Sequence, residues 1–160
     1  MNADPLTMRF MPGVMSEAES QVQIERFEAH HRLHGFGVWA LEAPGVAPLI
    51  GYTGLQRVGF DAPFVPAVEI GWRLAPEFWS RGYATEAARE ALRIGFEELN
   101  LDQIVSFTVL ANGPSWSVME RLGMTRDPAE DFDHPRLPVG HALRRHVLYR
   151  MKRASFQRIQ

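Results

Sequence analysis

The sequence predicts a mixed α/β (α+β) domain in which helices flank a central sheet. A strand-like run, Val68 to Leu74, is followed by a glycine-containing turn and then by a helix-like run from Ala84 to Leu99. Further strand-like runs lie on both sides of this strand–turn–helix unit. The composition, 46% hydrophobic and 22% charged over 160 residues, is that of an ordinary globular protein with a sizeable core. We therefore expect one domain, residues 1–160, with its core at about 36–153.

The first predicted element is a helix with a clear start and stop. Ser16 and Glu19 form a capping box, the pattern that satisfies free backbone donors at a helix N-terminus. The helix is expected to run to about Leu33 and to end at Gly35. The residues expected near one face are Val22, Ile24, Phe27 and His31.

Three strands are predicted to follow this helix. Residues 36–43 and 49–58 are expected to form a hairpin around the turn at 44–48, and residues 68–74 form the third strand. Side chains alternate along a strand, so the third strand has two distinct faces. One face carries Val68, Ile70, Trp72 and Leu74, and the other carries Glu69, Gly71 and Arg73.

The C-terminal half is expected to contain two helices and two strands. The helix from Ala84 ends near Asn100, and residues 104–110 form the next strand. A turn at residues 112–115 then leads into a short helix that ends at Gly123. The last two elements are expected to be a long loop at 126–142, rich in Asp, Pro and His, and a strand at 146–153.

The turn between the third strand and its helix, Trp79 to Ala87, indicates a class of ligand. Small residues at a helix start leave backbone N–H groups unpaired, and the helix dipole adds positive potential there. Gly82 and Ala84 allow a ligand to approach the backbone closely. The turn therefore predicts a site for the phosphate or pyrophosphate of a cofactor. It lacks the Lys-Ser/Thr ending of a P-loop, which leaves an ATP-binding protein as a weaker alternative.

Charge and composition argue against several other functions. The net charge of −2 does not favour a nucleic-acid partner. The absence of cysteine excludes disulfides, thiolate metal sites and a cysteine nucleophile. No apolar run approaches the roughly 20 residues that span a bilayer, and residues 1–5 do not resemble a signal peptide. We therefore expect a cytoplasmic protein with no membrane partner.

Two segments carry a resemblance to a known family. They are Glu69-Ile-Gly-Trp-Arg-Leu-Ala-Pro-Glu-Phe-Trp-Ser-Arg-Gly-Tyr-Ala-Thr-Glu-Ala and Asn112-Gly-Pro-Ser-Trp-Ser-Val-Met-Glu-Arg-Leu-Gly-Met124. In this order, with a strand and a helix flanking the first, they resemble the GNAT superfamily of acyl-CoA-dependent N-acyltransferases. The resemblance covers most of residues 36–153 and is greatest for the branch that includes the ribosomal-protein N-terminal acetyltransferases.

The resemblance implies a GNAT-like fold and acetyl-CoA as cosubstrate. The third and fourth strands would splay apart to seat the pantetheine arm, which would pair with the backbone of Trp72, Arg73 and Leu74. Asn112 and Ser115 would lie beside the cofactor near the thioester. The residues that would bind the pyrophosphate are Trp79, Ser80, Arg81, Gly82, Tyr83, Ala84 and Thr85.

The chain departs from the family pattern at three places. The turn begins with Trp79 rather than Arg or Gln, as is common in this branch. Met119 replaces a Tyr that often serves as the acid for the leaving thiolate. Ala3 to Phe10 resembles a segment that normally follows a first strand and part of a first helix, so either the true start lies upstream or the fold begins without its first edge strand. An uncovered strand invites pairing with another chain, and the sequence therefore predicts a homodimer.

The implied reaction is the attack of a primary amine on the thioester of acetyl-CoA. Such an amine is mostly protonated near neutral pH, so a base must remove a proton, and Glu69 is the candidate. The alternative is a solvated carboxylate, or one paired with Arg73 or Arg57. Ser115 is the candidate proton donor to the thiolate, or else the N-cap of the following helix. Asn112 is either a cofactor contact or a turn residue only.

Histidines suggest two further sites, neither of them a metal centre. His30 and His34 are four residues apart on a helix, but no third ligand is evident nearby, so no metal is expected. They are read instead as polar residues that suit a helix C-terminus. His134, in the charged segment Asp131 to Arg136, is a candidate for the acceptor pocket or for proton transfer. Otherwise that segment is a turn-rich surface loop.

The sequence thus predicts an N-acetyltransferase that moves an acetyl group from acetyl-CoA to a primary amine, directly within a ternary complex. Three acceptor classes stay open: a protein N-terminal amine, an amino acid or antibiotic amine, and a polyamine. The alternative is a non-catalytic acyl-CoA-binding or interaction module, which would keep the phosphate turn but lack a base and an acid over the thioester.

Overall fold

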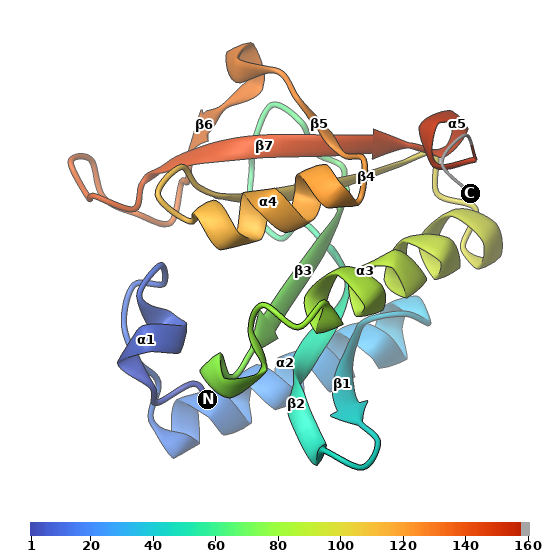
Figure 1. Ribbon diagram of the computed structural model, residues 1–160. Helices are drawn as coiled ribbons and strands as arrows, with labels where there is room; N and C mark the ends of the chain where they lie inside the picture. The colour runs from blue at the N-terminus through green and yellow to red at the C-terminus, as the bar shows by residue number, and fades with distance from the viewer. Residues whose placement is uncertain (158–160) are drawn as a thin grey trace.

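A seven-stranded sheet forms the centre of the computed structural model, which describes residues 1–157 (Figure 1). The strands lie in the order β1-β2-β3-β4-β7-β5, and β6 also pairs with β7. β3 and β4 run parallel, whereas the other pairs are antiparallel. The strands are β1 (Val38–Ala43), β2 (Ala47–Arg57), β3 (Val68–Leu74), β4 (Gln103–Val109), β5 (Thr125–Arg126), β6 (Phe132–Asp133) and β7 (Arg145–Lys152).

Helices cover both faces of this sheet. α3 and α4 lie over one face, and α2 lies behind β1 and β2 on the other (Figure 1). The helical segments are α1 (Pro5–Met8), α2 (Glu17–His34), η1 (Pro76–Phe78), α3 (Tyr83–Arg93), η2 (Ile94–Glu98), α4 (Gly113–Arg121), η3 (Pro128–Glu130) and α5 (Arg153–Phe156). This is the mixed α/β architecture that the sequence predicts. No helix among residues 1–157 is both long enough and apolar enough to cross a membrane.

α2 has the predicted ends, but the four residues expected near one face do not all share it. Ser16 and Glu19 form the capping box, and Gly35 ends the helix in the left-handed region at φ 77°. However, no residue of α2 is buried, and Val22 and Ile24 are 46% and 49% exposed. The prediction that Val22 shares a face with Ile24 was wrong, because residues two apart point to different sides of a helix. Phe27 alone of these makes a ring contact, edge-on to Tyr52 at 5.3 Å.

β3 and β4 pair at one end and then separate. Their only registered pair is Glu69 with Val105, and beyond it the Ser106 hydroxyl on β4 donates to the Ile70 carbonyl at 2.9 Å. Because the strands are parallel, both continue toward their carboxyl ends without further pairing. This is the splayed arrangement expected from the resemblance, and it opens the sheet between Trp72 and Thr108.

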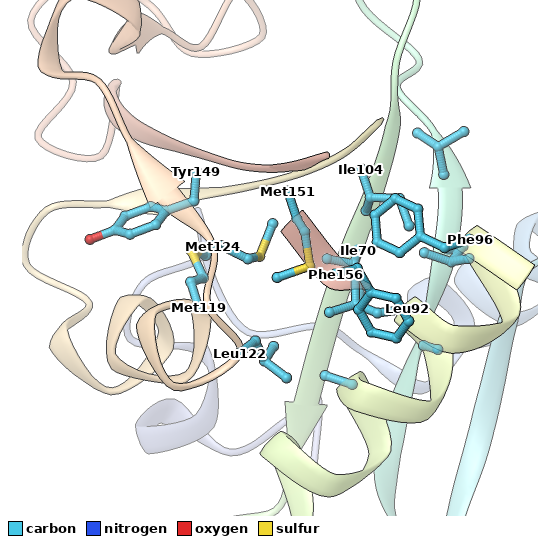
Figure 2. Close-up of a cluster of buried hydrophobic side chains, with 14 of the residues drawn as sticks. Ile70, Leu92, Phe96, Ile104, Met119, Leu122, Met124, Tyr149, Met151 and Phe156 are labelled. Atoms are coloured by element: carbon cyan, nitrogen blue, oxygen red, sulfur yellow. The ribbon is translucent and has the colours of Figure 1, made fainter. Parts of the chain in front are cut away.

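One apolar core packs beside this opening and fixes the positions of β3 and β4. It gathers side chains of β3, β4, β7, α3, η2, α4 and α5, among them Ile70, Leu92, Ile104, Met119 and Phe156 (Figure 2). The predicted helix from Ala84 to Leu99 is confirmed as α3 followed by the π-helical turn η2. Gly95 in η2 allows this close approach, since a Cβ there would lie 2.5 Å from the Ile104 Cδ1.

The segment at residues 126–142 is more ordered than the predicted long loop. β5 and β6 both pair with β7, and η3 lies between them. Phe132 of β6 packs with Val105 and Leu148 in a second small core. The prediction of a loop was wrong here, because two-residue strands are too short to produce a period-two pattern.

β1 is an edge strand within the part of the chain that the structure describes. It pairs with β2, and no strand precedes it among residues 1–37. The outer edge of β1 is therefore unpaired within the described residues. The homodimer expected from this open edge stays a prediction.

Two glycines that face each other across β2 and β3 offer a matched test of the packing. A Cβ on Gly54 would lie 2.3 Å from the Gly37 carbonyl oxygen and 2.4 Å from the Val38 Cα, whereas one on Gly71 would meet nothing within 4 Å. We expect Gly54→Ala to lower the free energy of unfolding by about 1–3 kcal/mol, because backbone atoms must move. Gly71→Ala should change it by less than about 1 kcal/mol. Equal urea-unfolding midpoints for the two variants would contradict this account.

Candidate active site

A cavity of about 460 Å³ lies where β3 ends and where α3 and α4 begin. We call it the turn cavity, because the turn at residues 79–82 forms part of its wall. The sequence-predicted cofactor residues that line it are Trp72, Arg73, Leu74, Trp79, Ser80, Gly82, Tyr83, Ala84, Thr85, Asn112 and Ser115. Arg81 is exposed and does not line the cavity. One cavity thus brings together residues from three separate segments of the chain.

The turn presents an uncapped helix start to this cavity. Gly82 adopts φ 88°, a left-handed conformation that favours glycine, and Ser80 shares that region at φ 59°. No side chain caps α3, and its first helical hydrogen bond runs from the Glu86 N–H to the Gly82 carbonyl at 3.0 Å. The preceding N–H groups, at residues 83–85, are therefore available to an anion.

Trp79 joins the turn to the end of β3. Its indole Nε1 donates to the Leu74 carbonyl at 2.7 Å. The Arg9 guanidinium lies 5.2 Å from the Trp79 ring and 4.8 Å from the Phe10 ring. Trp79 therefore contributes packing and a hydrogen bond to the turn, and it adds no charge.

The N-terminal segment forms a wall that sequence reasoning missed. Its members in the turn cavity are Leu6, Thr7, Arg9, Phe10 and Met11. The family resemblance of Ala3 to Phe10 did not point to a role in a site, and the segment has no clear periodicity. The one local signal is the Asp4 carboxylate, which accepts hydrogen bonds from the Thr7 N–H at 2.8 Å and the Thr7 hydroxyl at 2.5 Å and so caps α1.

The backbone of β3 presents free polar groups to the gap beside β4. The Gly71 carbonyl accepts from the Thr53 hydroxyl on β2, whereas the Ile70 carbonyl accepts from Ser106 on β4, each at 2.9 Å. Backbone groups alternate in direction along a strand, so Trp72 directs its N–H and C=O toward β4. The strands no longer pair at that level, and an extended ligand could complete these hydrogen bonds.

A second cavity, of about 270 Å³, adjoins the first on the α2 side of the sheet. We call it the Glu69 cavity. Glu69, Gly71 and Arg73 line it, as expected for alternate residues on one face of β3. Its wall also includes Gln23, Phe27, Tyr52, Gln56 and Phe107. The residues that line both cavities are Met11, Trp72, Arg73, Asn112 and Ser115.

Glu69 is a half-buried carboxyl that has no hydrogen bond or ion pair among the described residues. Burial raises its pKa to about 7, and the positive charge of Arg136 opposes the rise. Within residues 1–157 it forms neither a hydrogen bond nor an ion pair, so the alternative of a pair with Arg73 or Arg57 is not observed. A carboxyl that titrates near neutral pH and faces a cavity is suited to accept a proton from a bound amine.

Ser115 lies at the junction of the two cavities, in the first turn of α4. The N-cap of α4 is Asn112, so the alternative of Ser115 as the N-cap was wrong. The Asn112 amide donates to the Thr108 hydroxyl at 2.9 Å. Asn112 is thus a turn residue that also lines both cavities. Met119 is 1% exposed, which makes the family's usual tyrosine position part of the core.

The two histidine sites have other roles. His30 uses both ring nitrogens, since Nδ1 contacts the Phe36 carbonyl at 2.9 Å and Nε2 accepts from the Arg57 N–H at 3.0 Å. It therefore ties α2 to the sheet. His134 packs 4.5 Å from the Phe60 ring and 5.1 Å from the His146 ring, and it lines neither cavity. No cluster of three metal-ligating side chains occurs in the described part of the chain.

The sequence matches the family described as "Acetyltransferase (GNAT) domain" over residues 1–125. The chain therefore belongs to the GNAT acetyltransferase family. It is 44% identical over 73 residues to the "Uncharacterized N-acetyltransferase YnaD" of Bacillus subtilis, which covers 46% of this chain and 41% of that protein. It is 38% identical over 95 residues to the "FsC-acetyl coenzyme A-N(2)-transacetylase" of Aspergillus fumigatus. This match covers 57% of this chain and 40% of that protein. The chain thus spans about two fifths of the length of these two relatives.

A solved structure supports the same fold over a longer span. The GNAT-family acetyltransferase from Bacillus anthracis superimposes with a TM-score of 0.75 at 25% sequence identity. The superposition covers 96% of this chain and 85% of that chain. The mixed α/β GNAT fold is therefore shared over nearly the whole sequence.

The half-buried carboxyl has a consequence for stability. Its folded pKa of about 7 lies above the ordinary value of 4.5, so the folded state holds the proton more tightly than the unfolded chain does. The contribution of Glu69 to stability is thus fully present below pH 4.5 and is lost as the pH rises through 7. We expect Glu69→Gln to be more stable than the parent at pH 8 by on the order of 1–3 kcal/mol, with the difference vanishing near pH 4.

Urea unfolding at both pH values checks this expectation, and Glu42→Gln, on an exposed side chain of β1, is the control. The control should change the unfolding free energy by less than about 0.5 kcal/mol at either pH. A Glu69→Gln variant that is less stable than the parent at pH 8 would contradict the half-buried, unpaired carboxyl.

Proposed function

We propose that this chain transfers an acetyl group from acetyl-CoA to a primary amine by direct transfer in a ternary complex. The observation that carries the proposal is the junction at which the two cavities meet, beside the free backbone of Trp72. The turn cavity would hold the cofactor, and the Glu69 cavity would hold the acceptor. The names of the relatives, which are N-acetyltransferases, support the same reaction.

The residues proposed for the cofactor follow from the lining of the turn cavity. The pyrophosphate would accept hydrogen bonds from the uncapped N–H groups at the start of α3. The pantetheine arm would pair with the β3 backbone near Trp72 in the gap beside β4. The thioester would then lie beside Asn112 and Ser115, which line both cavities.

Glu69 would act as the base. It accepts a proton from the ammonium form of the acceptor, directly or through water, and the free amine attacks the thioester carbonyl carbon. A C–N bond forms, the carbonyl oxygen becomes an oxyanion, and a backbone N–H of β3 would stabilise it. As the intermediate collapses, the C–S bond breaks and the Ser115 hydroxyl would protonate or hydrogen-bond the departing thiolate of CoA. The new amide nitrogen loses its extra proton in the same step, and this proton would pass to the sulfur through Ser115, so that the Ser115 hydroxyl is restored.

The rival function is a non-catalytic acyl-CoA-binding module. A buried Met119 in place of an acidic tyrosine favours it, whereas the unpaired Glu69 at the cavity favours an enzyme. We assign the chain to the enzyme class, as one N-acyltransferase domain of the branch that includes ribosomal-protein N-terminal acetyltransferases. Turnover separates the two functions.

Removal of the base should abolish transfer while sparing the cofactor. We expect Glu69→Gln to lower kcat/KM for thiol release by about 10²–10⁴-fold, the usual contribution of a general base. The Kd of acetyl-CoA, measured by calorimetry, should stay within about threefold. The parent rate should rise with pH as Glu69 loses its proton near pH 7. An unchanged rate in the variant removes Glu69 from the mechanism.

The glycine turn can be tested with a matched pair of glycines. Gly82 and Gly140 have φ of 88° and 85°, and a Cβ on either would meet nothing within 4 Å. Alanine at each position therefore causes similar backbone strain. Gly82→Ala should weaken acetyl-CoA binding at least about tenfold, because the N–H groups at the start of α3 turn away, whereas Gly140→Ala should not. Equal affinities would locate the cofactor elsewhere.

A further inference from the structure

A cationic side chain, Arg73, lines the Glu69 cavity, and acetyl transfer to a simple amine does not require it. Arg73 lines both cavities and shares a face of β3 with Glu69. It follows Trp72 directly, whereas Glu69 lies three residues before Trp72. An amine at the junction would therefore lie between the carboxyl of Glu69 and the guanidinium of Arg73.

The Arg73 guanidinium is held in place without being neutralised. Its Nη1 donates to the Asn2 side-chain oxygen at 3.0 Å, and its central carbon lies 5.3 Å from the Tyr52 ring centroid. Asn2 in turn donates to Ser20 and Gln23 of α2 at 3.2 and 3.1 Å. Each of these partners is uncharged, and Arg73 forms no salt bridge to another residue of the described chain. The side chain is thus positioned while most of its donors stay available.

The charge of the cavity disfavours a polycationic acceptor. Glu69 is the only Asp or Glu among the described residues that line it. Because its pKa is about 7, this carboxyl is only partly ionised near neutral pH. A polyamine would therefore bring a second cation close to Arg73 and would find one partly charged carboxyl. Like charges in a confined site oppose such binding.

We propose that Arg73 binds a carboxylate that the acceptor carries close to its reactive amine, so that amino-acid-type amines are preferred over polyamines. A guanidinium presents two parallel N–H groups that match the two oxygens of a carboxylate. Gly71, between Arg73 and Glu69 on the same face, leaves open space for the acceptor. This inference rests on the proposed acetyl transfer and names its substrate class.

The test compares amino acids with their amides, which lack the carboxylate, and with a polyamine. Thiol release from acetyl-CoA is measured with amino acids, with the corresponding amino acid amides and with spermidine. The parent should use the amino acids at least about tenfold better than their amides, as expected for a charge-assisted hydrogen bond. Arg73→Gln should lower kcat/KM for the amino acids by about 10- to 100-fold and leave the amides within about threefold.

Two further variants separate charge from shape. Arg73→Lys keeps the charge but loses the planar pair of donors, so it should recover only part of the preference. Arg89→Gln, on an exposed side chain of α3 that lines neither cavity, removes the same charge and should change nothing. The Kd of acetyl-CoA should be equal in all of these proteins.

A binding measurement gives a readout that does not need turnover. With CoA present, N-acetyl amino acids should bind the parent more tightly than N-acetyl amino acid amides, and Arg73→Gln should remove the difference. Amides or spermidine used as well as amino acids would overturn this inference and leave the acetyl transfer standing. So would a loss of acetyl-CoA affinity in Arg73→Gln, which would assign the side chain to the cofactor. Failure to bind acetyl-CoA at all would overturn the proposed function itself.

Discussion

The separation of β3 from β4 is the constraint on which the rest of the site depends. The two strands pair at Glu69 and Val105 and then separate. The Ser106 hydroxyl donates a hydrogen bond to the Ile70 carbonyl, the last carbonyl before the gap. Unpaired backbone groups inside a protein cost free energy, so an open gap in the middle of a sheet is stable only if something forces it. Here the core beneath β3, β4 and α3 joins the strands at one end, while α4 begins just past the far end of β4 (Figures 1 and 2). The gap therefore presents backbone donors and acceptors to a ligand.

The same opening explains the unusual state of Glu69. Glu69 stands at the position where β3 pairs with β4, and its half-buried side chain faces a cavity rather than a hydrogen-bonding partner. Burial without a partner disfavours the charged form and moves the pKa toward neutral pH. In the proposed mechanism, the basicity of Glu69 comes with a loss of folding free energy above that pH. Stability and chemistry are thus opposed at one residue, as is common at functional sites.

The parts of this fold that sequence could predict are those with a period or a motif. β3 was predicted with its observed bounds, since residues 68–74 alternate and a proline follows soon after. The turn before α3 was predicted because a glycine and small residues between a strand and a helix are typical of an anion-binding turn. By contrast, the wall formed by the N-terminal segment depends on contacts such as Asn2 with Arg73, which are 71 residues apart and leave no local pattern. Burial of Glu69 is likewise a property of its neighbours, and no feature of the residues beside it in sequence encodes it.

β3 shows how a strand divides its side chains between folding and chemistry. Val68, Ile70 and Leu74 are buried and stabilise the sheet against the helices. On the other face, Glu69 and Arg73 lie about two periods apart, with only the hydrogen of Gly71 between them. A larger side chain at position 71 would fill the space between the Glu69 carboxyl and the Arg73 guanidinium. A glycine there sacrifices β-propensity, and nothing in the packing requires it, because a Cβ would meet no atom within 4 Å. In the proposed reaction, the room that Gly71 leaves would admit an acceptor that contacts both charged side chains at once.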